Sequence, residues 1–362
     1  MIGIITFHCQ YNYGSALQAY ALQETIKNLG YSCEIINYYY KKDMKNYDIR
    51  WSTKNVKVIL FDLVTFTKCF KRKKSYKQFH NIFFKLSNYT DNYNNLNEIC
   101  KKYDILISGS DQIWNFSITE GINPAYFLKF ASNSQKLISY APSIAMSNIP
   151  KNLEKKLKHE LERYSFVSVR EKATADQLSR IINKKVFCVL DPTLLLDKHY
   201  YNKHLLKSYH LNLPKDYIYI YCLHHNHLGV LEKFAENYAN KHKLKIVYFN
   251  KYNIKKRDYE LNTFEYDPRA FVYTIKHAKC VVSDSFHAGL FSIIYHKEFY
   301  TYALEDSKSR MDTVFDALNI KDRFINENSI KFNKIDYNEV DKLLKEKIRE
   351  SLEYLKGAID NI

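Results

Sequence analysis

Short apolar runs alternate with helix-length amphipathic segments along the whole chain, a pattern typical of parallel sheets with crossover helices. The first unit predicts a strand over 2–7, a turn over 12–14 and a helix over 15–29 that ends at Gly30. A second strand follows over 33–39. Four more strands, which we expect in the same sheet, are predicted over 105–108, 137–140, 166–170 and 186–190.

The alternation halts at Asp191-Pro192-Thr193 and restarts after a polar stretch that runs through Lys215. We therefore place a domain boundary near 195–215. The second half predicts four strands and four helices. The strands are expected over 217–223, 245–249, 280–283 and 299–302, and the helices over 229–241, 268–277, 288–295 and 309–318.

Two Rossmann-like α/β domains that face a cleft are the expected result, over 1–200 and 212–325. After them, Asp336 and Glu339 form a capping box that opens a long amphipathic helix over 336–359. We expect this C-terminal helix to pack back across the two lobes.

One segment interrupts the first domain. Residues 51–104 hold eleven Lys or Arg against four acids, and Lys71-Arg72-Lys73-Lys74 stand together. Apolar residues at near-helical spacing precede this cluster. The favoured interpretation is a helical insertion that packs on its own domain and leaves a solvated basic face. Contact with an anionic membrane surface or an acidic acceptor is the alternative.

Composition and charge narrow the classes of protein. The chain has 362 residues, 46% of them hydrophobic, and 55 Lys plus Arg against 39 Asp plus Glu, for a formal charge of +16. A chain with this hydrophobic content is expected to fold. Its positive charge is compatible with nucleic acid, an anionic membrane or acidic small substrates as partners. The sequence uses Lys, Asn, Ile and Tyr heavily, and this general bias of composition explains part of the positive charge through its many lysines. The basic run has no zinc-finger, helix-turn-helix or RNP pattern, so no nucleic-acid partner is expected.

The N-terminal apolar run is strand-sized and lacks the basic flank of a signal peptide. No stretch approaches the length needed to span a bilayer. The seven cysteines include no C-x-x-C pair and are expected to be reduced thiols. We therefore expect a cytoplasmic protein.

Ligands of open parallel sheets bind in the loops at the carboxyl ends of the strands, so those loops are where chemistry is expected. In the segment 280–294 a strand runs through small polar residues into a helix whose free N–H groups suit a phosphate. His287 stands at that helix start as a candidate proton donor, with Ser285 beside it. Helix capping or a structural histidine is the competing interpretation.

A second loop, over 107–115, concentrates polar side chains next to an indole. Carboxylate and amide groups bind hydroxyls, and an indole stacks on a sugar ring, so this set suits a sugar. An Asx-type turn that caps a helix is the alternative. The candidates are Ser110, Asp111, Gln112, Trp114 and Asn115.

Two arginines are candidate anion ligands. Arg170 ends a strand and Arg310 opens a helix, and guanidinium groups bind carboxylate or phosphate in a bidentate manner. Ion pairs with Glu171 or another nearby acid are the alternative. Glycine-rich dinucleotide and P-loop fingerprints are absent from the sequence, which disfavours nicotinamide or ATP enzymes of those kinds.

The run His224-His225-Asn226-His227 raises the question of a metal. Adjacent histidines of an extended segment point in opposite directions, and no H-E-x-x-H or carboxylate partner follows. We therefore expect no metal site, and we expect His224 to contact a phosphate or substrate instead.

Taken in order, these segments resemble the polysaccharide pyruvyl transferase family over roughly residues 2–325. One departure is Ala288-Gly289, where the family commonly has Gly directly after His. The matching motifs are the opening strand with 12–23, Gly109 to Asn115, Ser168 to Glu171, Asp191 to Leu195, Asp284 to His287, and Ser309-Arg310.

The resemblance implies a two-domain fold like that of GT-B glycosyltransferases, and an enzyme that makes a pyruvyl ketal from phosphoenolpyruvate and a sugar without a metal or other cofactor. His287 would protonate the methylene carbon of phosphoenolpyruvate, and Asp111 would orient or deprotonate the acceptor. Arg170 and Arg310 would bind the donor, and Ser285 would position His287 or the phosphate. The motifs also add Asn12, Gly14, Gln18 and Phe286 as candidate substrate-binding residues.

Acceptors of this family are often lipid-linked sugars, so peripheral association with the inner face of the membrane would be compatible with catalysis. Two other functions stay open from the sequence. One is a GT-B-like glycosyltransferase that uses a nucleotide-sugar donor. The other is a non-catalytic basic protein that binds a membrane surface.

Overall fold

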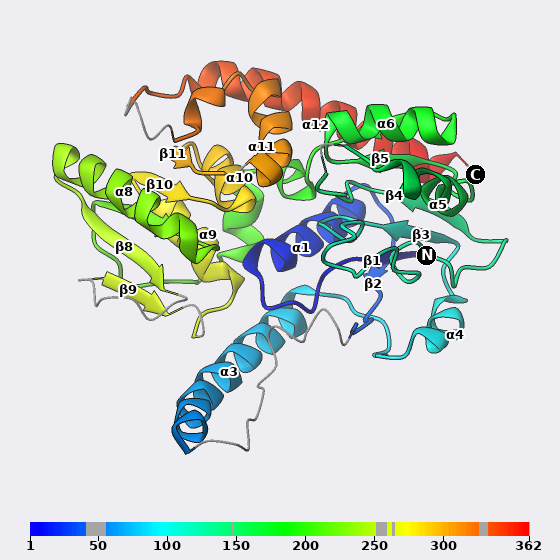
Figure 1. Ribbon diagram of the computed structural model, residues 1–362, viewed down its shortest axis with the longest axis horizontal. Helices are drawn as coiled ribbons and strands as arrows, with labels where there is room; N and C mark the ends of the chain where they lie inside the picture. Colours follow the sequence, from blue (N-terminus) through cyan, green and yellow to red (C-terminus); the bar gives the residue numbers. More distant parts are fainter. Residues whose placement is uncertain are drawn as a thin grey trace.

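A computed structural model shows two α/β lobes joined along one side by the last helix of the chain (Figure 1). The structure describes residues 1–40, 56–146, 148–250, 259–262, 265–303, 305–325 and 332–361.

The first lobe is built on four parallel strands in the order β2-β1-β3-β4. All of them are short, and their buried apolar residues match the continuous runs seen in the sequence. Strands β5 and β6 pair with each other in a separate two-stranded sheet. The six strands are β1 (Ile2–Ile5), β2 (Cys33–Ile35), β3 (Ile105–Ser108), β4 (Lys136–Ser139), β5 (Val167–Val169) and β6 (Val186–Cys188).

The prediction of one continuous sheet in this lobe is therefore wrong between β4 and β5. Between them the backbone ladder is reduced to an isolated bridge, Ile138 to Phe166, where the N–H of Ser139 donates to the carbonyl of Phe166 at 3.1 Å. Ser139 Oγ donates to the carbonyl of Ser168 and accepts from its N–H, at 2.8 and 2.9 Å, while Ser168 Oγ donates to the carbonyl of Ser139 at 2.8 Å. Serine hydroxyls thus take the hydrogen-bonding positions of the backbone ladder and end it.

Helices cover the first sheet, and α1 carries the residues of greatest interest. Asn12 caps α1 by accepting from the N–H groups of Gly14 and Ser15, so the helix begins two residues earlier than predicted. The short elements η2 and α7 lead out of the lobe. The helices are α1 (Tyr13–Asn28), α4 (Leu96–Cys100), α5 (Lys151–Leu161), α6 (Lys172–Ile182), η2 (Pro192–Leu195) and α7 (Lys198–Tyr200).

The second lobe is a five-stranded parallel sheet in the order β11-β10-β7-β8-β9. Its strands are β7 (Tyr217–Tyr221), β8 (Lys245–Asn250), β9 (Tyr259–Asn262), β10 (Cys280–Ser283) and β11 (Glu298–Thr301). Its helices are α8 (Leu228–His242), α9 (Pro268–His277), α10 (Phe286–Ile294) and α11 (Glu305–Ala317). Both lobes are thus Rossmann-like, as predicted.

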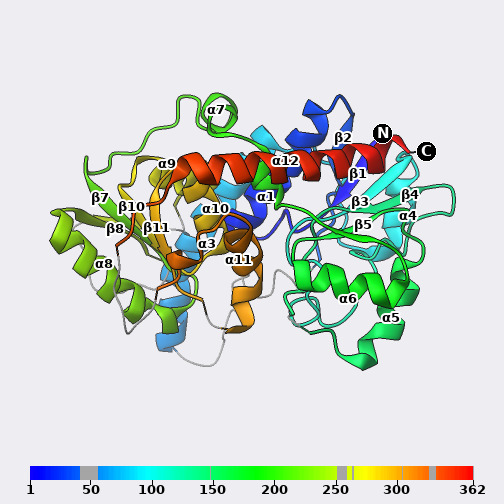
Figure 2. The same cartoon turned by 90° about the horizontal axis from the view of Figure 1, so that it is seen from above.

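Helix α12 (Tyr337–Asp360) runs lengthwise over both lobes, as Figure 2 shows. At its start Tyr337 donates to the carbonyl of Lys297 in the second lobe. Near its end Tyr354 donates to the carbonyl of Ser139 in the first lobe at 2.9 Å, and Leu355 is fully buried. Asp336 caps the helix by accepting from the N–H groups of residues 338 and 339. The expected C-terminal helix across the lobes is confirmed.

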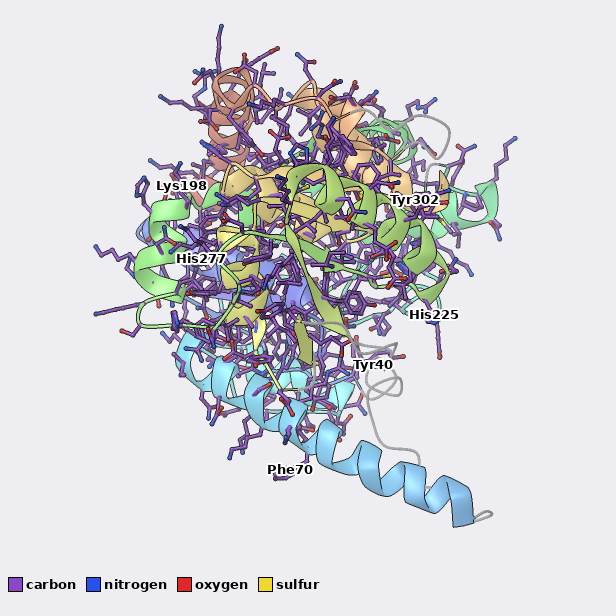
Figure 3. The ribbon with its side chains drawn as sticks, turned by 90° about the vertical axis from the view of Figure 1, so that its left-hand side faces the viewer. Tyr40, Phe70, Lys198, His225, His277 and Tyr302 are labelled. Atoms are coloured by element: carbon purple, nitrogen blue, oxygen red, sulfur yellow. The ribbon has the colours of Figure 1, made fainter. Side chains whose placement is uncertain are left out.

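Helix α3 (Val56–Phe83) projects from the body at its N-terminal end (Figures 1 and 3). Its C-terminal part packs inward through Tyr76 and Phe79, which are 1% and 0% exposed, whereas Phe70 is 61% exposed. Phe70 is one of the apolar residues predicted to precede the basic cluster, and the side chains of the others lie outside those that the structure describes. Within the described part of the chain, no helix has the combination of length and apolar character needed to cross a bilayer.

Candidate active site

The residues of the candidate site come from loops at the carboxyl ends of strands in both lobes. Helix α10 begins directly after β10 in the second lobe, and its first turn carries His287. Ser285 caps this helix by accepting from the N–H of Ala288 at 3.4 Å. The helix starts two residues earlier than predicted, so His287 lies inside its first turn.

The ring of His287 faces Asp191 of the first lobe. His287 Nε2 lies 3.6 Å from Asp191 Oδ2, and the side chains are 9% and 0% exposed. His287 Nε2 has no hydrogen-bond partner among the described residues. The imidazole is therefore close to a carboxylate without being tied to it, which leaves Nε2 able to exchange a proton with a ligand.

Asp191 is held from three sides. Arg170 Nη2 lies 3.2 Å from its Oδ2, and Thr193 donates to its Oδ1 from the backbone at 2.9 Å and from the hydroxyl at 2.6 Å. Burial acts to raise the pKa of Asp191, but Arg170, His287 and Thr193 outweigh it and hold the pKa below its ordinary value. Asp191 is thus a buried anion that neutralises a cation of its own lobe and faces the imidazole of the other.

Gly14, in the first turn of α1, lies against the other nitrogen of the same imidazole. A Cβ built on Gly14 would lie 2.1 Å from His287 Nδ1, far closer than any side chain allows. Glycine is therefore required here so that the helix backbone can approach the ring. Asn12 caps the same turn, so both residues act by shaping the first lobe around His287.

Two arginines and one phenyl ring form the cationic part of the site. The guanidinium carbons of Arg170 and Arg310 lie 5.0 and 5.8 Å from the centre of the Phe286 ring. Burial, and then the charge of Arg170, lower the pKa of Arg310, and Glu171 partly offsets them. Arg170 Nε and Nη1 and Arg310 Nε are buried with no acceptor among the described residues. Buried N–H donors of this kind suit an anionic ligand.

Asp111 joins this network from the end of β3. Its Oδ2 accepts from the Ser15 hydroxyl at 2.6 Å, and its Oδ1 lies 3.9 Å from Arg170 Nη2. The same Arg170 nitrogen donates to Ser110 Oγ at 2.9 Å. The structure therefore brings Ser110 and Asp111 together with Arg170, as buried neighbours of the site.

Trp114 is not part of the site, and its expected role as a sugar platform is wrong. Its side chain is fully buried, its ring stacks on Phe127 with centroids 5.0 Å apart, and its Nε1 donates to the carbonyl of Tyr126 at 3.2 Å. Both the face and the polar edge of the indole are used by the core of the first lobe. Nearby, Asn115 Nδ2 donates to Gln112 Oε1 at 2.8 Å, which matches the turn interpretation of this loop.

Gln18 is also an internal residue. It is fully buried in α1, where its amide nitrogen donates to the Thr6 hydroxyl at 2.9 Å and to the carbonyl of Ser15 at 2.8 Å. These bonds fix the loop between β1 and α1. Gln18 Nε2 therefore supports the start of α1, whereas Gln18 Oε1 is buried with no hydrogen-bond partner among the described residues, so a contact of this oxygen with substrate stays a prediction.

His224 lies in a second polar cluster, on the loop after β7. Its Nδ1 is 2.9 Å from Asp284 Oδ2, and its side chain is 57% exposed. Asp284 also accepts from the N–H groups of Leu223 and His224, at 2.7 and 2.9 Å. Burial raises the pKa of Asp284, but His224 and these two N–H groups outweigh it and lower the pKa. Asp284 thus ties the β7 and β10 loops together.

Asp191 was not predicted as a site residue, although Asp191-Pro192-Thr193 stands out in the sequence as the end of the first alternation. The signal was available, because Asp191 follows β6 and Arg170 follows β5, its parallel partner. Carboxyl ends of paired parallel strands lie at the same edge, so their first loop residues come together. Glu171, next to Arg170, is a second such residue: burial raises the pKa of its carboxyl, and Ser143 donates to it.

Comparisons with known proteins identify a family and a fold. The model of a family described as polysaccharide pyruvyl transferase matches residues 12–306. A search of curated proteins finds no match.

Solved structures show similarity of fold. A Listeria monocytogenes protein described as a UDP-N-acetylglucosamine 2-epimerase has a TM-score of 0.55 and 13% identity, over 99% of this chain and 89% of the other. The S. aureus MnaA structure with UDP has a TM-score of 0.52 and 11% identity, over 98% and 90% of the two chains. These neighbours support a GT-B-like arrangement of two Rossmann-like domains.

Proposed function

The chain belongs to the polysaccharide pyruvyl transferase family, a family of transferases of polysaccharide biosynthesis, and we propose that it transfers the pyruvyl group of phosphoenolpyruvate to a sugar. The acceptor is a cell-surface polysaccharide or its lipid-linked precursor, and the product is a pyruvyl ketal. The observation that carries this proposal is the placement of His287 Nε2 3.6 Å from buried Asp191, beside two arginines with unpaired N–H groups.

The arginines suit the donor by charge. Phosphoenolpyruvate carries a phosphate and a carboxylate, and Arg170 and Arg310 offer buried donors to such oxygens. The free N–H groups at the start of α10 add a further positive pole beside His287. Burial and then repulsion by Arg170 lower the pKa of Arg310, and an anionic donor would offset that repulsion.

His287 acts as the general acid in the proposed mechanism. Its protonated ring delivers a proton to the methylene carbon of the donor, which leaves an oxocarbenium-like centre at C2. A sugar hydroxyl attacks C2 and gives up its proton to a base. The C2–O bond to phosphate then breaks, and phosphate leaves with the electron pair. A neighbouring hydroxyl attacks the new oxocarbenium-like centre to close the cyclic ketal. Of the two hydroxyl protons, one restores protonated His287 and the other leaves with phosphate. Asp191, 3.6 Å from the same Nε2, stabilises the imidazolium by its negative charge before the transfer.

Asp111 is the proposed partner of the acceptor hydroxyl. It lies in the first lobe, across from His287, with Ser15 and Arg170 fixing its carboxylate. A carboxylate so placed would orient the attacking hydroxyl and accept its proton.

The test is phosphate release from phosphoenolpyruvate in the presence of simple or lipid-linked glycosides, with the pyruvyl mass gain of the acceptor as the second readout. We expect His287→Gln to lower turnover by about 10²-fold or more, since that is the range for loss of a general acid. Arg170→Gln should raise the KM for the donor more than it lowers kcat. The proposal would be overturned if the enzyme used a nucleotide-sugar donor, with release of the nucleotide, in place of phosphoenolpyruvate. Wild-type turnover in His287→Gln would also overturn it.

The proposal places the reaction at the cytoplasmic face of the membrane, where a lipid-linked acceptor would be reached. The basic cluster of α3 offers limited support, because Lys71 pairs with Glu265 at 2.8 Å and Arg72 donates to the carbonyl of Tyr11. Flotation with liposomes that contain or lack anionic lipid tests this location. Flotation that requires anionic lipid supports it, and no flotation with either contradicts it.

A further inference from the structure

We propose that His224, His227 and Asp284 form a binding site for one divalent transition metal ion, with zinc as the best fit. These residues come from the loop after β7 and the loop after β10, and among the described residues no hydrogen bond or ion pair joins them to Asp191 or Arg170. The inference does not depend on the proposed function.

The first argument is convergence of the ligand atoms. His224 Nδ1 and His227 Nδ1 each lie 2.9 Å from Asp284 Oδ2, and one ligand atom from each of the three residues lies within 4.8 Å of the others. Ligands of a tetrahedral zinc ion are about 3.3 Å apart when the bonds are about 2.0 Å long. Small shifts of the two imidazoles would therefore bring all three atoms to bonding distance of one ion.

The second argument is the crowding of donors around one oxygen. Asp284 Oδ2 has three nitrogens at 2.9 Å, the two Nδ1 atoms and the backbone nitrogen of His224. A carboxylate oxygen has two lone pairs, so three N–H donors exceed its capacity. If the two imidazoles present lone pairs to a shared cation instead, only the backbone N–H remains as a donor to Oδ2, and the crowding is resolved.

The third argument is the type and support of the ligands. Two neutral imidazoles and one carboxylate are ligands that suit zinc, and three protein ligands leave one position for water or substrate oxygen. Asp284 is oriented by the backbone N–H of Leu223 at 2.7 Å, and the His227 ring packs edge-on against Tyr302 with centroids 5.2 Å apart. Such support holds ligands in place before the metal binds.

Access to the site is through His224, whose side chain is 57% exposed, while His227 is 6% exposed and Asp284 is fully buried. Cys222 lies near the cluster, with its sulfur 4.0 Å from Asp284 Oδ2, but it donates to the carbonyl of His224 at 3.1 Å. We therefore assign three protein ligands and leave the thiol out.

The sequence predicted no metal site here, because adjacent histidines of an extended segment point in opposite directions. The structure joins His224 with His227 instead, around the single turn η4 (His225–His227), and takes the carboxylate from Asp284, far along the chain. Residues three apart in a 3-10 turn lie on the same side, which adjacent residues of a strand do not. Figure 3 labels His225 at the edge of the molecule, and this residue provides a matched control.

The experiment is a calorimetric titration of tag-free, EDTA-treated full-length protein with Zn²⁺, with His224→Asn and His225→Asn as the paired variants. We expect one Zn²⁺ per chain for the wild type and for His225→Asn, and an affinity at least about 100-fold weaker for His224→Asn, since loss of an outer-shell partner alone costs 10- to 100-fold. No stoichiometric binding, or equal affinity of the two variants, would overturn the site.

A measurement on the wild-type protein alone guards against a variant that fails to fold. X-ray absorption of the zinc-loaded chain should show two imidazole ligands and otherwise oxygen. Sulfur in the coordination shell, or a single imidazole, would contradict the assignment of His224, His227 and Asp284.

Discussion

The imidazole of His287 and the carboxylate of Asp191 belong to different lobes and face each other with Nε2 and Oδ2 3.6 Å apart. Each is nearly or fully buried, and the carboxylate is also bound by Arg170. The proposed mechanism needs a proton on His287 of the second lobe, and the negative charge that stabilises this proton belongs to Asp191 of the first lobe. This dependence of one lobe on the other leads to the first prediction.

Replacing Asp191 with Asn should lower kcat by about 10- to 100-fold, because the amide removes the negative charge that favours a protonated imidazole. Phosphate release at saturating substrate measures kcat. Asp197→Asn is the matched control, since Asp197 is an exposed helix cap to which Tyr200 donates at 2.7 Å. An unchanged kcat in Asp191→Asn would show that Asp191 only stabilises the fold.

Replacing Gly14 with Ala should displace the ring of His287 and lower turnover by about 10²-fold, within the range for a misplaced catalytic group. The reason is steric, because the new methyl group would lie 2.1 Å from His287 Nδ1. Gly357→Ala in α12 is the control, because its nearest contact would be an ordinary 3.8 Å. Steady-state kinetics and circular dichroism of both variants check this prediction. Wild-type kcat in Gly14→Ala would contradict the tight approach of α1 to the ring.

Replacing Trp114 with Ala should lower the free energy of unfolding by about 3 to 5 kcal/mol, the range for a buried Trp in a well-packed core. Trp114→Phe should cost less, because the ring still stacks on Phe127 but the hydrogen bond to Tyr126 is lost. Urea denaturation measures both. In Trp114→Phe the KM for the acceptor should stay at its wild-type value. A KM raised by tenfold in that stably folded variant would restore Trp114 as a sugar-binding residue.

Acid should destabilise the fold through His80. Burial, and then the charge of His8, lower the pKa of His80 from 6.5 to about 3, and its Nε2 has no partner among the described residues. Below pH 6.5 the unfolded chain therefore binds a proton that folded His80 excludes, and stability falls as pH falls. For one such group the loss between pH 6.5 and 5 is about 1.5 kcal/mol.

The check is the free energy of unfolding of His80→Phe across that pH window. A phenyl ring can keep the stack on Phe84, whose centroid lies 4.8 Å from that of His80, and it takes up no proton. The variant should thus lose less stability on acidification than the wild type. Exposed His159 on α5 gives the control variant, His159→Phe, which should keep the wild-type slope. Equal slopes for His80→Phe and wild type would remove His80 as the cause.

Much of the fold was predictable because its elements depend on local patterns. Helix α9 and strand β10 have the predicted bounds, and both are bounded by clear signals such as the Asp267 cap and its following proline. Strand β9 was not predicted, since its polar sequence, Tyr259–Asn262, gains its partner only through pairing with β8. The break between β4 and β5 was missed for a similar reason, because two serine side chains from distant segments create it.

Some residues of the candidate site were likewise predictable from the sequence, and others were not. His287 and Arg170 were predictable as polar residues that end buried strands or open helices. The roles of Trp114 and Gln18 were not, since residue type alone does not say whether an indole or an amide faces solvent or the core. The pairing of His227 with Asp284 depends on two loops meeting at one sheet edge, and no local spacing encodes that distance.

Helix α12 has a consequence for how the protein is made. Its last turns supply Tyr354, Leu355, Ala358 and Ile359 to the same buried cluster as Ile2 and Ile4 of the first strand. A nascent chain that has not yet reached α12 therefore has an N-terminal lobe with an incomplete hydrophobic core. Folding of this lobe can be completed only after the C-terminal helix has been synthesised, and fragments that stop short of α12 will expose these core residues to water.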